Sequence, residues 1–152
     1  MKKKTIAIEI VITLCIGVVA IPLMMYLEGI QQSLSAYAKH TDTIIIFKVW
    51  MLSLAYGAYR SSDMKGAHIP AILIAVFDLS IDNGYMDALH NMSAIIFMAV
   101  MIVALYERYK TTSMLITISL LTYPIIGMYY GELLTIIIMY GHYIRKATKL
   151  IV

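Results

Sequence analysis

The sequence predicts an all-α fold: a polytopic transmembrane bundle of six helices, forming one domain over residues 1–152, with both termini in the cytoplasm. Three observations predict it. The chain is 61% hydrophobic and only 14% charged, whereas about a quarter of the residues in a soluble domain are charged. Its apolar residues form long runs separated by short polar segments. Its basic residues gather in alternate segments, as they do in multi-pass membrane proteins.

Four apolar runs can be delimited directly. The first, residues 6–27, has the roughly 20 residues that a helix needs to cross a bilayer, and it is longer than a signal-peptide core, so we expect a retained span. Polar segments on either side of residues 43–59 and 67–81 delimit spans two and three. The turn signal Asn83-Gly84 then precedes span four at residues 88–106.

The remaining apolar stretch is too long for one crossing. As a single helix, residues 113–144 would measure about 48 Å, well beyond a hydrocarbon core of about 30 Å. The chain must therefore turn, and we expect the turn near Gly131. This gives span five at residues 113–128 and span six at residues 132–144.

The distribution of Lys and Arg predicts the orientation. Ten of the twelve basic residues fall on the side of the termini: Lys2, Lys3, Lys4, Arg60, Lys65, Arg108, Lys110, Arg145, Lys146 and Lys149. Lys39 falls on the opposite side, and Lys48 falls inside span two. Because cytoplasmic loops carry the excess of basic residues, this bias places both termini inside. It fits an integral, multi-pass protein of a prokaryotic plasma (inner) membrane.

Lys48 and Asp78 each lie about one turn inside the outer end of their spans. Adjacent antiparallel spans would bring the two side chains to similar depth. A charge in hydrocarbon costs several kcal/mol unless it is paired or reaches the interface. A structural ion pair between Lys48 and Asp78 is one explanation, and extension of Lys48 alone to the membrane surface is the other.

A group of titratable residues on the outer side supplies the imidazole and carboxylate ligands that bind zinc. The candidate metal ligands are His40, Asp42, Asp78, Asp82, Asp87 and His90, of which Asp78, Asp82, Asp87 and His90 are the candidate catalytic residues. A bound zinc ion would activate water toward an ester or amide. No pair among them has a spacing specific to metal sites, which favours the other explanation, that these are solvated or mutually satisfied polar groups.

Two motifs resemble a known family. Span four opens with Leu89-His90-Asn-Met-Ser-Ala94-Ile-Ile-Phe97, and the last span opens with Glu132. This pattern resembles the Frag1/DRAM/Sfk1-like family of six-span membrane proteins. The resemblance implies that His90, Ala94, Phe97 and Glu132 occupy the family's marked positions on the outer side. Leu133 departs from the pattern, because the family has Trp there. Members are associated with lipid remodelling, lipid asymmetry and autophagy-linked membranes without a settled common chemistry, so the resemblance bears on the fold more than on the function.

We therefore expect a small integral membrane protein without catalytic chemistry, which binds lipid between its spans or serves as an accessory subunit of a membrane complex. Its expected partners are membrane lipids and other membrane subunits or copies of itself, and a net charge of +3 without a basic face argues against nucleic acid. No cofactor is predicted. The alternative is a metal-dependent intramembrane lipid hydrolase or transferase that uses the outer His/Asp cluster with zinc.

Overall fold

The computed structural model describes residues 2–64, 66–77, 84–106 and 108–151. Of these residues 87% are helical and none lies in a strand, which confirms the all-α prediction. The elements are α1 (Lys2–Glu28), the 3-10 helix η1 (Leu34–Lys39), α2 (Ile44–Ser61), α3 (His68–Val76), α4 (Gly84–Tyr106), α5 (Lys110–Leu121), α6 (Tyr123–Ile126) and α7 (Met128–Ile151).

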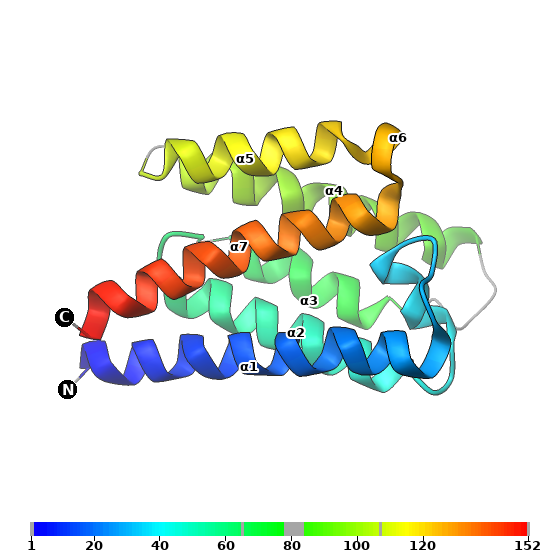
Figure 1. Ribbon diagram of the computed structural model, residues 1–152, viewed down its shortest axis with the longest axis horizontal. Coiled ribbons are helices and arrows are strands. Elements are labelled where there is room, and N and C mark those ends of the chain that lie inside the picture. Colours follow the sequence, from blue (N-terminus) through cyan, green and yellow to red (C-terminus); the bar gives the residue numbers. More distant parts are fainter. Residues whose placement is uncertain (1, 65, 78–83, 107, 152) are drawn as a thin grey trace.

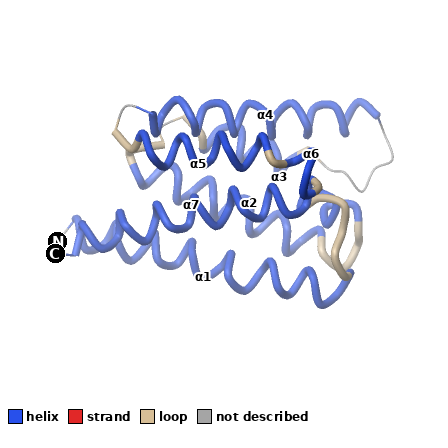
Figure 2. Tube along the Cα trace, turned by 45° about the horizontal axis from the view of Figure 1, so that its top comes forward, coloured by secondary structure: helices blue, strands red, loops and turns tan. Residues whose placement is uncertain are grey.

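The helices pack as a closed ring in chain order. Helix α1 packs on α2, α2 on α3, α3 on α4, α4 on α5 and α5 on α7, and α7 returns to α1 (Figure 1). Each long helix runs antiparallel to the one before it (Figure 2). Both termini therefore lie at one end of the bundle, here called the termini end. The opposite end carries η1, which packs on α2 and α7, and is called the η1 end.

Small residues and buried hydrogen bonds hold α1, α2 and α7 together. The Trp50 indole donates a hydrogen bond to the Tyr140 hydroxyl, 2.9 Å away in the core. A side chain at Gly17 would collide with the Tyr140 ring, and a side chain at Gly57 would crowd Thr13. Glycine at these two positions therefore permits the close helix approach on which the buried bond depends.

Among the residues that the structure describes, two helices are long and apolar enough to cross a membrane, over Lys3–Glu28 and Gly84–Tyr106. These agree with expected spans one and four. Helix α3 has nine residues and α5 has twelve, or about 14 and 18 Å at 1.5 Å per residue. Both are shorter than a bilayer core. Residues 78–81, the end of expected span three, lie outside the described residues.

The turn before the last helix lies earlier than the sequence suggested. Gly127 has φ +86°, a conformation that favours glycine, and it ends α6, so α7 already begins at Met128. Gly131, the predicted turn, is helical and buried. A side chain there would overlap the Tyr123 ring. Gly131 is thus a packing residue, and our assignment of the turn to it was wrong.

Candidate functional site

A cleft of about 540 Å³ lies between α4, α5, α6, α7 and the start of η1. Its apolar wall follows one face of α4, at the three- and four-residue spacing that places side chains in a row along a helix. The lining residues are Ser33, Ser35, Asn91, Ala94, Ile95, Met98, Ala99, Ile102, Leu120, Tyr123, Met128 and Glu132. The polar members belong to η1 and to the helix segments nearest the η1 end, so the cleft is polar there and apolar deeper in the bundle.

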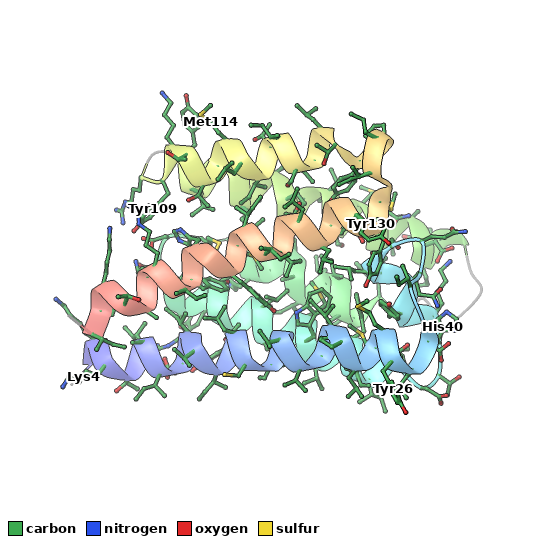
Figure 3. The ribbon with its side chains drawn as sticks, viewed as in Figure 1. Lys4, Tyr26, His40, Tyr109, Met114 and Tyr130 are labelled. Atoms are coloured by element: carbon green, nitrogen blue, oxygen red, sulfur yellow. The ribbon has the colours of Figure 1, made fainter. Side chains whose placement is uncertain are left out.

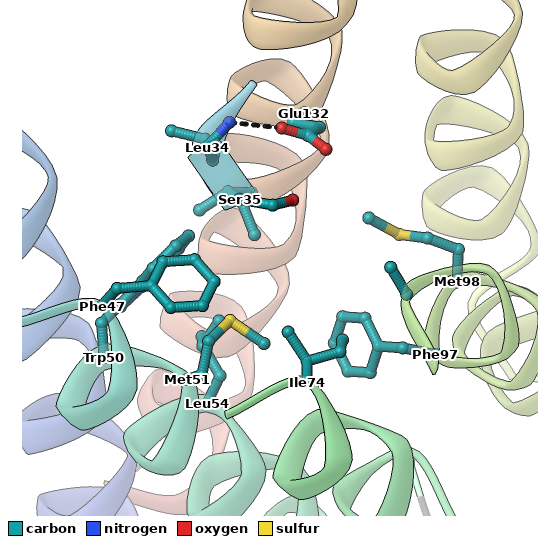
Figure 4. Close-up of a pocket in the computed structure, with 12 residues that line it drawn as sticks. Leu34, Ser35, Phe47, Trp50, Met51, Leu54, Ile74, Phe97, Met98 and Glu132 are labelled. Atoms are coloured by element: carbon teal, nitrogen blue, oxygen red, sulfur yellow. Dashed lines mark hydrogen bonds between the residues drawn. The ribbon is translucent and has the colours of Figure 1, made fainter. Parts of the chain in front are cut away.

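A smaller cavity of about 50 Å³ adjoins the cleft inside the ring (Figure 4). The two share Ser35, Ala94, Met98 and Glu132. Phe47, Trp50, Ile74 and Phe97 are among the side chains that close its inner side, and they come from α2, α3 and α4. The inner cavity, which reaches the buried core around Trp50, therefore borders the cleft along these four residues.

Glu132 connects η1 to the wall of both cavities. Its Oε2 accepts a hydrogen bond from the backbone N–H of Leu34 at 2.6 Å, as Figure 4 shows. Leu34 is the first residue of η1, and its N–H has no acceptor within so short a helix. The carboxylate thus satisfies a helix N-terminus and fixes η1 over the inner cavity.

Further hydrogen bonds make η1 a rigid cover. Ser33 Oγ accepts from the Ala36 N–H at 3.2 Å, which is a side-chain cap. The Tyr37 hydroxyl donates to the Gly29 carbonyl at 2.6 Å, and the Thr43 hydroxyl donates to the Tyr37 carbonyl at 2.7 Å. Tyr37 is fully buried, and this burial raises its pKa, so its hydroxyl remains a donor at neutral pH.

A polar cavity of about 220 Å³ opens beside the cleft at the η1 end. It is lined by Gln32, Ser33, Ser35, Ala36, Lys39, Asp87 and Asn91. Lys39 Nζ and Asp87 Oδ2 lie 3.4 Å apart, with side chains 53% and 36% exposed. The polar cavity shares Ser33, Ser35 and Asn91 with the cleft, so the two lie side by side and have a common border.

The candidate metal ligands that the structure describes do not converge. His40 Nδ1 contacts Glu28 Oε2 at 3.1 Å, whereas Asp87 contacts Lys39. His90 is fully buried, and its ring lies 6.1 Å from that of Phe47. Asp42 is exposed. Within the described ranges, no three His, Cys, Asp or Glu side chains are close enough to share a metal ion.

Asp78 and Asp82 lie outside the described residues, and with them the predicted Lys48–Asp78 ion pair. Lys48 itself lies in α2 and is half-buried.

The four positions marked by the family resemblance gather around the inner cavity. Ala94, Phe97 and Glu132 line it directly. His90 lies one helical turn before Ala94, against the ring of Phe47, which also lines the cavity. Of the four, Ala94 and Glu132 also line the cleft. The sequence did not identify η1 as its cover, because no local pattern shows that Leu34 meets Glu132, 98 residues away.

A second polar cluster, at the termini end, was also missed. The Asp63 side chain is only 2% exposed, and its carboxylate contacts Lys146 and, at 3.5 Å, Arg108. His142 Nε2 lies 3.9 Å from the same carboxylate. Asp63 lies in the connection between α2 and α3, and its carboxylate brings together cations from α7 and from the α4–α5 connection. The spacing of apolar residues in the sequence gives no sign that a single acidic residue in a turn, such as Asp63, is buried.

Comparison with protein-family models, with curated proteins and with solved structures gives no match for this chain. The family resemblance therefore rests on the motif residues alone, and any function must be argued from the cleft.

Proposed function

We propose that the chain is a multi-pass integral membrane protein that binds a membrane lipid, with an acyl chain in the cleft between α4, α5 and α7, and that it has no catalytic chemistry of its own. One observation carries the proposal. The cleft is apolar along α4 and polar at the η1 end, which is the pattern that an amphipathic ligand requires. Its volume of about 540 Å³ lies in the range of about 300–1,000 Å³ usual for small-molecule sites.

The surface supports a membrane environment. Large apolar side chains are exposed on every long helix, for example Val19 at 64%, Val103 at 71% and Ile137 at 57%. A soluble monomer rarely exposes contiguous apolar surface on this scale. Tyr26, His40 and Tyr130 lie at the η1 end and Lys4 and Tyr109 at the termini end (Figure 3). Polar and aromatic residues at both ends, with apolar surface between, are typical of a membrane-spanning protein.

The antiparallel ring supports six crossings. Helices α1 and α4 are the two candidate spans, and the other helices alternate in direction between the same two ends. Basic residues of α1, α2, α7 and the α4–α5 connection lie at the termini end. This supports cytoplasmic termini in an inner membrane by the positive-inside rule.

Trp50 provides the test. It is the only tryptophan of the chain, lines the inner cavity and is 2% exposed, so lipid around the bundle does not touch it. In nanodiscs of phospholipid with brominated acyl chains, entry of a chain should quench Trp50 fluorescence. Ala94 lines both the cleft and the inner cavity. Ala94→Phe places an aromatic ring at this common border and should abolish most of this quenching.

Val103→Phe is the matched control, because it adds an aromatic ring to the same helix at a position 71% exposed. It should leave the quenching of Trp50 unchanged. Equal quenching in all three proteins, or none in the wild type, would contradict lipid binding in the cleft. Circular dichroism of each variant checks that the helices are retained.

A further inference from the structure

We propose that the polar cavity at the η1 end recognises a zwitterionic headgroup with a primary amine, a phosphoethanolamine, on the lipid whose chain occupies the cleft. This inference rests on the proposed function and names the class of lipid. The two spaces are neighbours: because Ser33, Ser35 and Asn91 line both, the headgroup of a lipid whose chain lies in the cleft would be next to the polar cavity.

The charges around this space are of both signs. Lys39 from η1 and Asp87 from α4 line the polar cavity, whereas Glu132 from α7 lines the cleft and the inner cavity. The Lys39–Asp87 contact is long, at 3.4 Å, and largely exposed. Exposed pairs of this kind contribute about 0–1 kcal/mol, so a ligand can replace the contact at little cost. Each partner is then available to the opposite charge of a zwitterion.

The hydrogen-bond donors and acceptors around the polar cavity and the cleft match the phosphate, amine and ester groups of one lipid. Lys39 and the η1 serine hydroxyls suit a phosphate, whereas Asp87 suits an ammonium group. Tyr123 lines the cleft, and its buried hydroxyl makes no hydrogen bond of good geometry to a described residue, although Thr135 lies close enough to interact with it. The Tyr123 hydroxyl can donate to an ester carbonyl of the same lipid. A buried hydroxyl without an acceptor is costly, which points to a ligand that supplies one.

The same groups discriminate against other headgroups. A purely anionic headgroup would bring its charge close to Asp87 and Glu132 without a compensating amine. A choline headgroup carries a quaternary amine that donates no hydrogen bond to a carboxylate. Charge-assisted hydrogen bonds contribute about 1.5–3 kcal/mol, so we expect preference for ethanolamine over choline lipid of about tenfold or more.

The experiment titrates one brominated lipid at a time into nanodiscs of unbrominated phosphatidylcholine and follows Trp50 fluorescence in the full-length protein. The brominated lipids carry ethanolamine, choline or glycerol headgroups on identical chains. Half-maximal quenching should require about tenfold less ethanolamine lipid than choline or glycerol lipid. Soluble glycerophosphoethanolamine, which has no acyl chains, should not relieve the quenching at the same concentration, because binding depends on the chain in the cleft.

Two variants locate the recognition. Asp87→Asn keeps the side-chain shape and removes the partner of the amine, so the preference for ethanolamine over choline should fall to about one while choline lipid binds as before. Asp42→Asn removes an exposed carboxylate from the same end outside the polar cavity and should keep the full preference. An unchanged preference in Asp87→Asn would overturn the inference.

The outcomes separate the two proposals. If all three lipids quench Trp50 equally and Ala94→Phe still abolishes quenching, lipid binding in the cleft stands and headgroup recognition fails. If soluble glycerophosphoethanolamine competes, the ligand is a free phosphoethanolamine compound and not a lipid. If no lipid quenches Trp50, both proposals fail.

Discussion

Removing the carboxylate of Glu132 should release η1 from the bundle. The Glu132 side chain accepts a hydrogen bond from the Leu34 N–H at 2.6 Å, and Leu34 is 3% exposed. Glu132→Ala leaves that buried N–H without an acceptor. Hydrogen bonds to charged groups contribute about 1.5–3 kcal/mol, which sets the expected loss of stability. Glu132→Gln keeps an acceptor oxygen but no charge, so its loss should be about 1 kcal/mol.

Two measurements check this prediction. Thermal unfolding in detergent, followed by circular dichroism, should show a midpoint lowered by about 2–4 °C for each kcal/mol lost. Hydrogen exchange should show faster exchange at Leu34–Lys39 in Glu132→Ala, with α2 protected as in the wild type. Asp42→Ala, which removes an exposed acid at the same end, is the control. If η1 of Glu132→Ala is as protected as that of the wild type, the carboxylate does not hold η1 and our reasoning is refuted.

Two further predictions concern the other titratable groups. Asp63→Asn should lower the unfolding free energy by about 3 kcal/mol, because it leaves Lys146, whose side chain is 15% exposed, without its buried counter-charge. The double variant Asp63→Asn with Lys146→Met should recover part of that loss. Equal unfolding midpoints for Asp63→Asn and wild type would contradict the prediction. Elemental analysis of the purified protein should find no stoichiometric zinc or iron, whereas stoichiometric metal that disappears in His90→Ala would support the metal-dependent alternative.

The sequence predicted the helices better than the contacts between them. Apolar runs located α1, α2 and α4 to within a few residues, because long runs of apolar residues are strong local signals. The turn before α7 was misplaced because Gly127 and Gly131 look alike in sequence. Only the packed structure shows that one needs a positive φ and that the other needs to lack a side chain beside Tyr123.

The candidate site was predictable only in part, for a related reason. Ala94, Phe97 and Glu132 were found through a motif, whereas Asn91 and Met98 follow from the helical spacing once one wall residue of α4 is known. The contribution of η1 depends on hydrogen bonds between residues far apart in sequence, which periodicity does not encode. Titratable residues crowded near Asp87 suggested a metal site, but Asp87 contacts Lys39, whereas His40 contacts Glu28.

The position of the cleft follows from the unequal lengths of the helices in the ring. Helix α4 has 23 residues and α7 has 24, whereas α5, which packs between them, ends after twelve at Leu121. Toward the η1 end α5 therefore stops before its neighbours do, and α6 and η1 border the remaining space. Replacing Pro124, in the first turn of α6, with Ala would allow α5 to continue through Thr122 into this space, and it would move Tyr123 of the cleft wall while leaving Lys39 and Asp87 in place. Such a variant should lose quenching of Trp50 by all lipids alike, as expected if the shortness of α5 is what creates the site.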